Sequence, residues 1–286
     1  MKIHLTHLVA ALGFAGLTVS ATPIPDTCLT GGFAIGCQAW TFNHFSVMEA
    51  IDKTAAAGGK VIEFYSGQKF SPDKPDLKFD PDATDEMIAA VKARLVERGV
   101  RAVNYGVVDI PKDEAAARKI FEFAKKLDLY GLTTESVGSM DTIEKLVKEY
   151  DICVGFHDHQ RQPNNPGYKM WDPNYVLSVV KDRDPRIGSC ADTGHWVQSG
   201  LKPVDCLKIL QGRIISVHLH DMNEMSPGCH DVPAGTGVAD VPGILDELKR
   251  QHFAGNISIE YEYNWNNNVT DAAQCIGFVR GYGARP

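Results

Sequence analysis

Hydrophobic residues gather in eight short runs along the chain, and most of these runs are followed by a segment of helical periodicity. Two such segments, 83–99 and 113–131, carry apolar residues at three- and four-residue spacing and a glycine near the C-terminal end. Strands that alternate with helices form a parallel sheet, and eight units in a chain of 286 residues predict a (β/α)8 TIM barrel. A doubly wound open sheet is the alternative, although no GxGxxG or Walker loop follows any run. The eight predicted strands are 33–40, 61–66, 101–108, 132–137, 152–157, 186–192, 214–220 and 257–262.

The N-terminal stretch has the layout of a cleavable secretory signal. Lys2 precedes an apolar stretch from Leu8 to Val19, which is followed by Ser20 and Ala21. A buried first helix is the alternative reading, but prolines follow at once. We therefore expect a signal peptide over 1–21, a single domain over 22–286, and a secreted or periplasmic protein.

Composition and charge exclude several classes of protein. The chain is 44% hydrophobic and 23% charged, which is ordinary for a globular domain. Its formal net charge of -7 argues against a nucleic-acid partner, because proteins that bind the phosphate backbone usually carry a positive surface. After the signal no segment is long enough to span a membrane, so no membrane partner is expected. Homo-oligomerisation is left open.

Polar residues collect at the ends of the predicted strands. In a TIM barrel the C-terminal strand ends carry the active site. A mixture of imidazoles and carboxylates there is the ligand set of a divalent cation such as Mn, Zn or Co. Single residues have simpler readings, because Glu63 alone could be a solvated loop residue and Asp192 a helix cap. The strand-end residues are Trp40, Glu63, Glu135, His157, His159, Asp192, His195, His218, His220, Asp221, Glu260 and Glu262.

Four stretches together resemble a known family. "ADTGHW" (191–196), "ISVHLHDM" (215–222), "HDVPAGTG" (230–237) and "ISIEYE" (257–262) resemble the sugar phosphate isomerase/epimerase family, whose members have a xylose isomerase-like TIM barrel. That family includes ketose 3-epimerases, inosose dehydratases and, more distantly, endonuclease IV-type repair enzymes. The resemblance covers roughly residues 33–282.

The resemblance implies a ligand set for one divalent metal ion. Asp192 and His218 would bind the metal, and Glu260 would complete the site from the last strand, with Glu262 as its competitor. At the fifth strand the chain departs from the family, because His157 stands where many members carry a metal-binding glutamate. Glu135 at the end of the fourth strand is then the expected fourth ligand.

The remaining strand-end residues are assigned to catalysis and substrate binding. An imidazole titrates near neutrality, so His157 and His159 are candidate acids or bases beside Glu260; a pure ligand role for His157 and a substrate-binding role for His159 are equally open. Substrate contacts are expected from Trp40, Glu63, His195, His220 and His230.

A bound metal in such a site would stabilise an enediolate formed from a keto-sugar. The resemblance therefore implies a metal-dependent sugar isomerase or epimerase that acts on a small carbohydrate. The glycine-rich stretch 230–237 has no Lys or Arg, which favours an uncharged sugar over a phosphorylated one. One alternative is a lyase or dehydratase that eliminates from a keto-sugar in the same site. The others are an endonuclease IV-like nuclease and a non-catalytic sugar-binding barrel.

Overall fold

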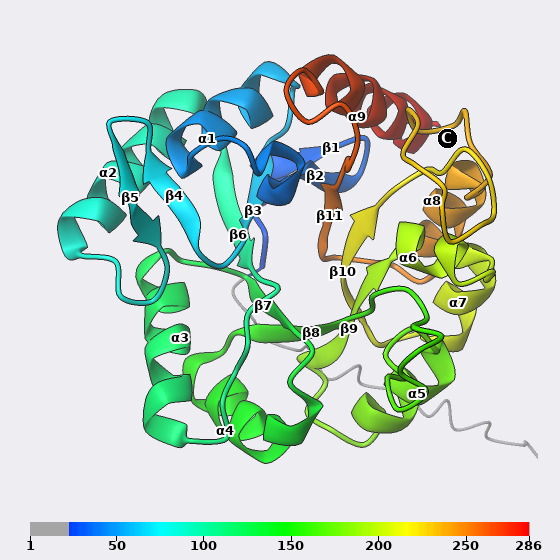
Figure 1. Cartoon of the computed structure of the whole chain (residues 1–286), viewed down its shortest axis with the longest axis horizontal. Helices are drawn as coiled ribbons and strands as arrows, with labels where there is room; N and C mark the ends of the chain where they lie inside the picture. The colour runs from blue at the N-terminus through cyan, green and yellow to red at the C-terminus, as the bar shows by residue number, and fades with distance from the viewer. Residues whose placement is uncertain (1–22, 286) are drawn as a thin grey trace, which may run out of the picture.

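Eight parallel strands close into a barrel with helices around it (Figure 1). A computed structural model describes residues 23–285, so the predicted signal peptide lies outside the described residues. Around the barrel the strands follow the order β2-β3-β6-β7-β8-β9-β10-β11, and β11 pairs with β2 to close the ring. The predicted TIM barrel is confirmed. Its strands are β2 (Phe33–Gln38), β3 (Val61–Phe64), β6 (Arg101–Tyr105), β7 (Gly131–Thr134), β8 (Cys153–His157), β9 (Ile187–Asp192), β10 (Ile214–Leu219) and β11 (Asn256–Ile259).

The barrel strands are buried on both faces, as expected for a parallel sheet covered by helices. Every residue of β2, β3, β7, β8, β9 and β11 is buried. Strands β2 and β3 approach so closely that a Cβ on Gly36 would lie 1.6 Å from the carbonyl oxygen of Val61. Only glycine fits at that position.

The helices form the outer ring in Figure 1, and local sequence signals set their ends. Ser46 forms a capping box with Glu49 at the start of α1, and Gly99 ends α2 with a positive φ of 64°. The two helices expected over 83–99 and 113–131 are α2 and α3. The helices are α1 (Val47–Ala56), α2 (Asp85–Arg98), α3 (Glu114–Lys126), α4 (Met140–Tyr150), α5 (Pro173–Val180), α6 (Thr193–Gln198), α7 (Pro203–Ile209), α8 (Val241–Arg250) and α9 (Val269–Gly283).

Two features of the described chain were not predicted. A hairpin of β4 (Gln68–Ser71) and β5 (Lys74–Phe79) is inserted between β3 and α2, and the short β1 (Leu29–Thr30) pairs antiparallel with β2. Several strands also end earlier than expected, so that Glu135, Glu260 and Glu262 lie just beyond β7 and β11. Within residues 23–285, none of the helices combines the length and apolar character that a membrane crossing needs.

The register of neighbouring strands brings the candidate residues together. His218 of β10 pairs directly with Asp192 of β9, and His157 of β8 pairs with Cys190 of β9. Their side chains therefore lie at the same end of the barrel.

Candidate functional site

Asp192 stands at the junction of β9 and α6, where it caps the helix. Its Oδ1 accepts a hydrogen bond of 2.7 Å from the backbone N–H of His195. The next residues must be small, because a Cβ on Gly194 would lie 2.7 Å from Cγ of His220. Only one carboxylate oxygen is used by the cap, so Oδ2 is left to face the barrel axis. The helix-cap reading of Asp192 is confirmed, and Oδ2, which has no hydrogen-bond partner, remains available for the predicted metal role.

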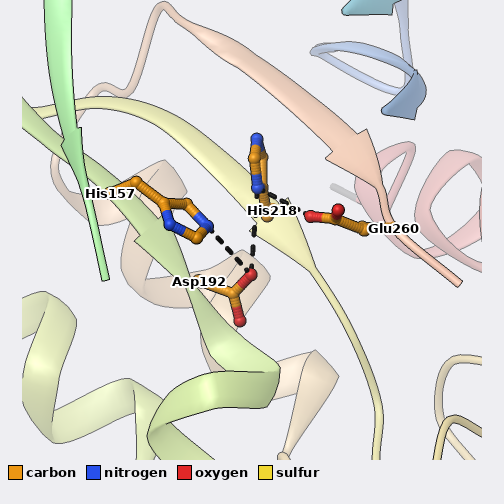
Figure 2. A group of neighbouring side chains, drawn as sticks. All are labelled: His157, Asp192, His218 and Glu260. Carbon is orange, nitrogen blue, oxygen red and sulfur yellow. Dashed lines mark ion pairs between the residues drawn. The ribbon is translucent and has the colours of Figure 1, made fainter. Parts of the chain in front are cut away.

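Four buried side chains converge at this end of the barrel: His157, Asp192, His218 and Glu260 (Figure 2). One ligand atom from each lies within 4.8 Å of the others. Asp192 Oδ2 is 3.5 Å from Nε2 of His157 and 3.8 Å from Nδ1 of His218, which is in turn 2.7 Å from Oε2 of Glu260. Two imidazoles and two carboxylates therefore face one point.

The atoms of this group fit a cation better than they fit one another. Oδ2 of Asp192 and both ring nitrogens of His218 are buried without an aligned hydrogen-bond partner. An unpaired buried polar atom costs free energy, and a metal ion at the centre of the group would remove that cost. Nitrogen and oxygen ligands in this number suit Zn, Mn or Co.

The electrostatics of the group point the same way. Burial alone would lower the pKa of His157, but contacts with Asp192 and Glu135 raise it well above its usual value. Burial would raise the pKa of Glu260, yet the charge and hydrogen bonding of His218 hold it below its usual value. The carboxylates thus attract positive charge, which protons or a cation can supply.

A pocket of about 400 Å³ opens above the group. His157 and Glu260 belong to both the group and the pocket wall. No Lys or Arg lines this pocket. Its lining residues are Gln38, Trp40, Tyr65, Ser66, Val107, His157, His159, Gln160, His195, Glu260 and Glu262.

Glu135 lies outside this four-residue group and forms a second set of possible metal ligands with His157 and His159. Its carboxylate contacts Nδ1 of His159 and lies 3.3 Å from Nδ1 of His157, and Tyr168 donates a hydrogen bond of 3.1 Å to it. Burial would raise the pKa of Glu135, but hydrogen bonds with His157 and His159 bring it to about 2. His157 is the fourth member of the group, because its Nε2 lies 3.5 Å from Oδ2 of Asp192 while Glu135 contacts Nδ1 of the same ring.

Trp40 and His195 lie on the pocket wall, as expected for substrate contacts. The indole of Trp40 is 39% exposed, donates a hydrogen bond of 2.8 Å to Oε1 of Glu262 and packs edge-on against Tyr65. Burial lowers the pKa of His195 to about 4, so its imidazole is neutral at pH 7.

Three other expected substrate contacts lie elsewhere. Glu63 is fully buried inside the barrel beneath His218. The ring of His220 is buried behind Asp192, with Nδ1 2.8 Å from Asp231. His230 packs against Tyr263, outside the pocket lining. Strand-end position alone did not reveal how deep each side chain lies.

Sequence reasoning missed Asp231, which ties the ends of β10 and β11 together. Its Oδ1 contacts His220, and its Oδ2 accepts a hydrogen bond of 2.9 Å from the backbone N–H of Glu262. Asp231 directly follows His230 in the "HDVPAGTG" stretch. The stretch was singled out from the sequence, but a functional role was assigned to its histidine alone.

The backbone amides of the glycine-rich loop after β10 bind the side-chain carboxylate of Asp221. Oδ2 of the buried Asp221 accepts hydrogen bonds of 2.8 Å from the backbone N–H groups of Gly235 and Gly237. Its Oδ1 accepts from Met222 and Ala239 at 3.1 and 3.0 Å. The Asp221 carboxylate thus occupies backbone N–H groups that in other glycine-rich loops bind phosphate.

The protein is a closed barrel with imidazoles and carboxylates at its C-terminal strand ends, and comparison with known proteins identifies its family. The profile of the xylose isomerase-like TIM barrel family matches residues 132–280. The chain belongs to this family.

Individual relatives agree with this assignment. A solved structure of a protein from Parabacteroides distasonis is 32% identical, with a TM-score of 0.69 over 87% of this chain and 99% of that one. The D-allulose 3-epimerase of Methylomonas sp. (18% identity, TM-score 0.67, 87% and 97% covered) and an L-ribulose 3-epimerase (17% identity, TM-score 0.65, 87% and 94% covered) share the fold.

A curated relative is the rhizopine catabolism protein MocC of Rhizobium meliloti. It is 25% identical over 204 residues, which span 65% of this chain and 60% of that protein. The match thus covers less than two thirds of that protein's own length.

Proposed function

We propose that the protein is a divalent-metal-dependent isomerase or epimerase of an uncharged keto-sugar. The observation that carries this proposal is the group of His157, Asp192, His218 and Glu260, whose unpaired buried atoms face one point at the base of a pocket. These four residues would hold the metal. When bound there, a divalent cation would polarise a carbonyl oxygen of the sugar and acidify the neighbouring C–H.

Residues of the pocket would perform the proton transfer. Glu260 contacts His218 and His220 through Oε2, so Oε1 is available to take a proton from the acidified carbon. On the pocket wall His159 contacts Glu135 through Nδ1, which leaves Nε2 to donate or accept a proton at the substrate. Trp40 would cover an apolar face of the sugar ring.

Two observations favour a substrate without phosphate. The pocket lining contains no Lys or Arg, and the amides of the glycine-rich loop are occupied by Asp221. A phosphate group would therefore meet Glu260 and Glu262 with no Lys or Arg beside it.

The replacement of a family glutamate by His157 supports a second candidate, elimination. A single carboxylate base can remove a proton next to the carbonyl while an imidazole acid, His159, protonates the leaving group at the following carbon. This reaction makes an unsaturated keto-sugar, whereas epimerisation conserves the substrate's composition. The predicted signal at 1–21 supports a secreted or periplasmic location for either activity.

A direct test is to load the mature protein with Mn²⁺, Co²⁺ or Zn²⁺ and incubate it with free keto-sugars and with their phosphate esters in D₂O. We expect conversion and carbon-bound deuterium with free sugars only, and loss of both in Glu260→Gln. An absorbing unsaturated product would select elimination. Absence of both conversion and deuterium with every sugar would contradict the proposal.

A further inference from the structure

A carboxylate that no part of the pocket uses lies inside the barrel. Glu63, in the middle of β3, is fully buried. Thr133 of β7 donates a hydrogen bond of 2.8 Å to its Oε1, while Ser258 and Asn256 of β11 donate to Oε2 at 2.9 and 3.4 Å. Burying a carboxylate is costly, and hydroxyl and amide donors offset part of that cost.

The only ionisable group that pairs with Glu63 within residues 23–285 is the imidazole of His218. Its Nε2 lies 3.1 Å from Oε2 of Glu63. The other ring nitrogen, Nδ1, faces the opposite way, 2.7 Å from Oε2 of Glu260 and 3.8 Å from Oδ2 of Asp192. The ring thus stands between a buried carboxylate and the four-residue group.

This arrangement decides which nitrogen of His218 carries a proton when the other one binds a metal. A histidine ligand binds through the lone pair of one nitrogen, and its other N–H is usually donated to a carboxylate or carbonyl. That donor interaction fixes both the tautomer and the plane of the ring. Nε2 of His218 and Oε2 of Glu63 are in contact but not aligned as a hydrogen bond, so the placement of the proton rests on their proximity and charge. A proton on Nε2 would face the Glu63 carboxylate and leave the lone pair of Nδ1 aimed at the group.

We propose that Glu63 is a positioning residue that holds the Nε2–H tautomer of His218 and thereby directs Nδ1 to the metal. This inference rests on the metal site of the proposed function. The structure offers a matched control in Thr133 of β7, which donates to the other oxygen of the same carboxylate and does not pair with His218.

The first test compares Glu63→Gln with Thr133→Val by calorimetric titration of the metal-free proteins with Mn²⁺ and Zn²⁺. We expect the dissociation constant to rise about 10- to 100-fold in Glu63→Gln, as when comparable partners of metal-bound histidines are removed. Thr133→Val should stay within about threefold of the wild type, even if thermal unfolding shows that both variants lose stability. Equal affinity in Glu63→Gln and the wild type, or equal losses in both variants, would overturn the proposal.

A second test does not require metal. The Nε2–H of His218 should give a downfield imidazole ¹H–¹⁵N signal protected from exchange, assigned by its absence in His218→Asn. We expect this signal to shift and to lose protection in Glu63→Gln but not in Thr133→Val. An unchanged signal in Glu63→Gln would refute the role of Glu63.

The two tests separate this inference from the proposed function. If Asp192→Asn abolishes metal binding while Glu63→Gln binds like the wild type, the metal site stands and the role of Glu63 falls. If the wild type binds no divalent metal, the proposed function falls, and the imidazole signal alone decides whether Glu63 orients His218.

Discussion

Replacing Asp221 with alanine should weaken the loop that follows β10. In the native protein the buried carboxylate accepts four backbone hydrogen bonds, from Met222, Gly235, Gly237 and Ala239, at 2.8–3.1 Å. A hydrogen bond to a charged group contributes about 1.5–3 kcal/mol, and contributions that share one acceptor do not add fully. We therefore expect the free energy of unfolding to fall by about 3–5 kcal/mol, the cost of removing one partner of a buried charged contact.

Guanidinium unfolding at pH 7, followed by tryptophan fluorescence, measures this loss. Asp221→Asn is the control, because it retains one acceptor oxygen and should lose less. The freed amides of Asp221→Ala form an anion site, so phosphate should stabilise this variant more than it stabilises the wild type. A loss below about 1 kcal/mol, together with an equal phosphate effect in both proteins, would refute the view that Asp221 serves as an internal anion.

Three further predictions concern stability, substrate and metal. Arg186 donates two side-chain hydrogen bonds of 2.9 Å to Asp184 and holds the pKa of that carboxyl below its usual value; such a group adds stability that is present above pH ~4 and lost as the pH falls. Asp184→Asn should therefore lower the free energy of unfolding by about 1–3 kcal/mol at pH 7 and progressively less below pH 4, as denaturant titrations at several pH values would measure. On the proposed function, Trp40→Ala should raise KM for the keto-sugar about tenfold with kcat and metal content unchanged, because the exposed indole lines the pocket but is not part of the metal group. Steady-state kinetics tests this, and an unchanged KM would count against a contact between Trp40 and the substrate. Gly194→Ala should weaken metal binding in calorimetric titrations, because its Cβ would displace the ring of His220, whose Nε2 lies 3.3 Å from Oδ2 of Asp192. Wild-type affinity would contradict this.

The fold could be predicted because its signals are local and repeated. Barrel strands such as β2 and β10 are largely apolar, and helices such as α2 and α3 carry a clear apolar periodicity with polar caps. The β4–β5 hairpin could not be predicted in this way, because the exposed positions of Lys74–Phe79 give it no apolar pattern.

The location of the candidate site at the strand ends could be predicted from the sequence, but the depth and contacts of its individual side chains could not. Asp192, His218 and Glu260 were expected together, and they lie together. The inward position of Glu63 was hidden, because alternation along a strand tells which face a residue occupies but not its height along the barrel axis.

The choice between Glu135 and His157 was also beyond the sequence. Both stand at strand ends, and only the three-dimensional structure shows that the His157 ring lies between Glu135 and Asp192, with one nitrogen near each carboxylate. The partners that orient the buried histidines, such as Asp231, come from loops whose course depends on the whole fold.

The metal content of the purified protein tests the central claim most directly. After reconstitution with Mn²⁺, Zn²⁺ or Co²⁺ and removal of free ions, elemental mass spectrometry should find about one metal ion per chain in the wild type. His230→Ala, which alters a histidine outside the group, should retain it, whereas Asp192→Asn and His218→Ala should lose it. A wild type without metal, or both site variants with full metal content, would contradict the account.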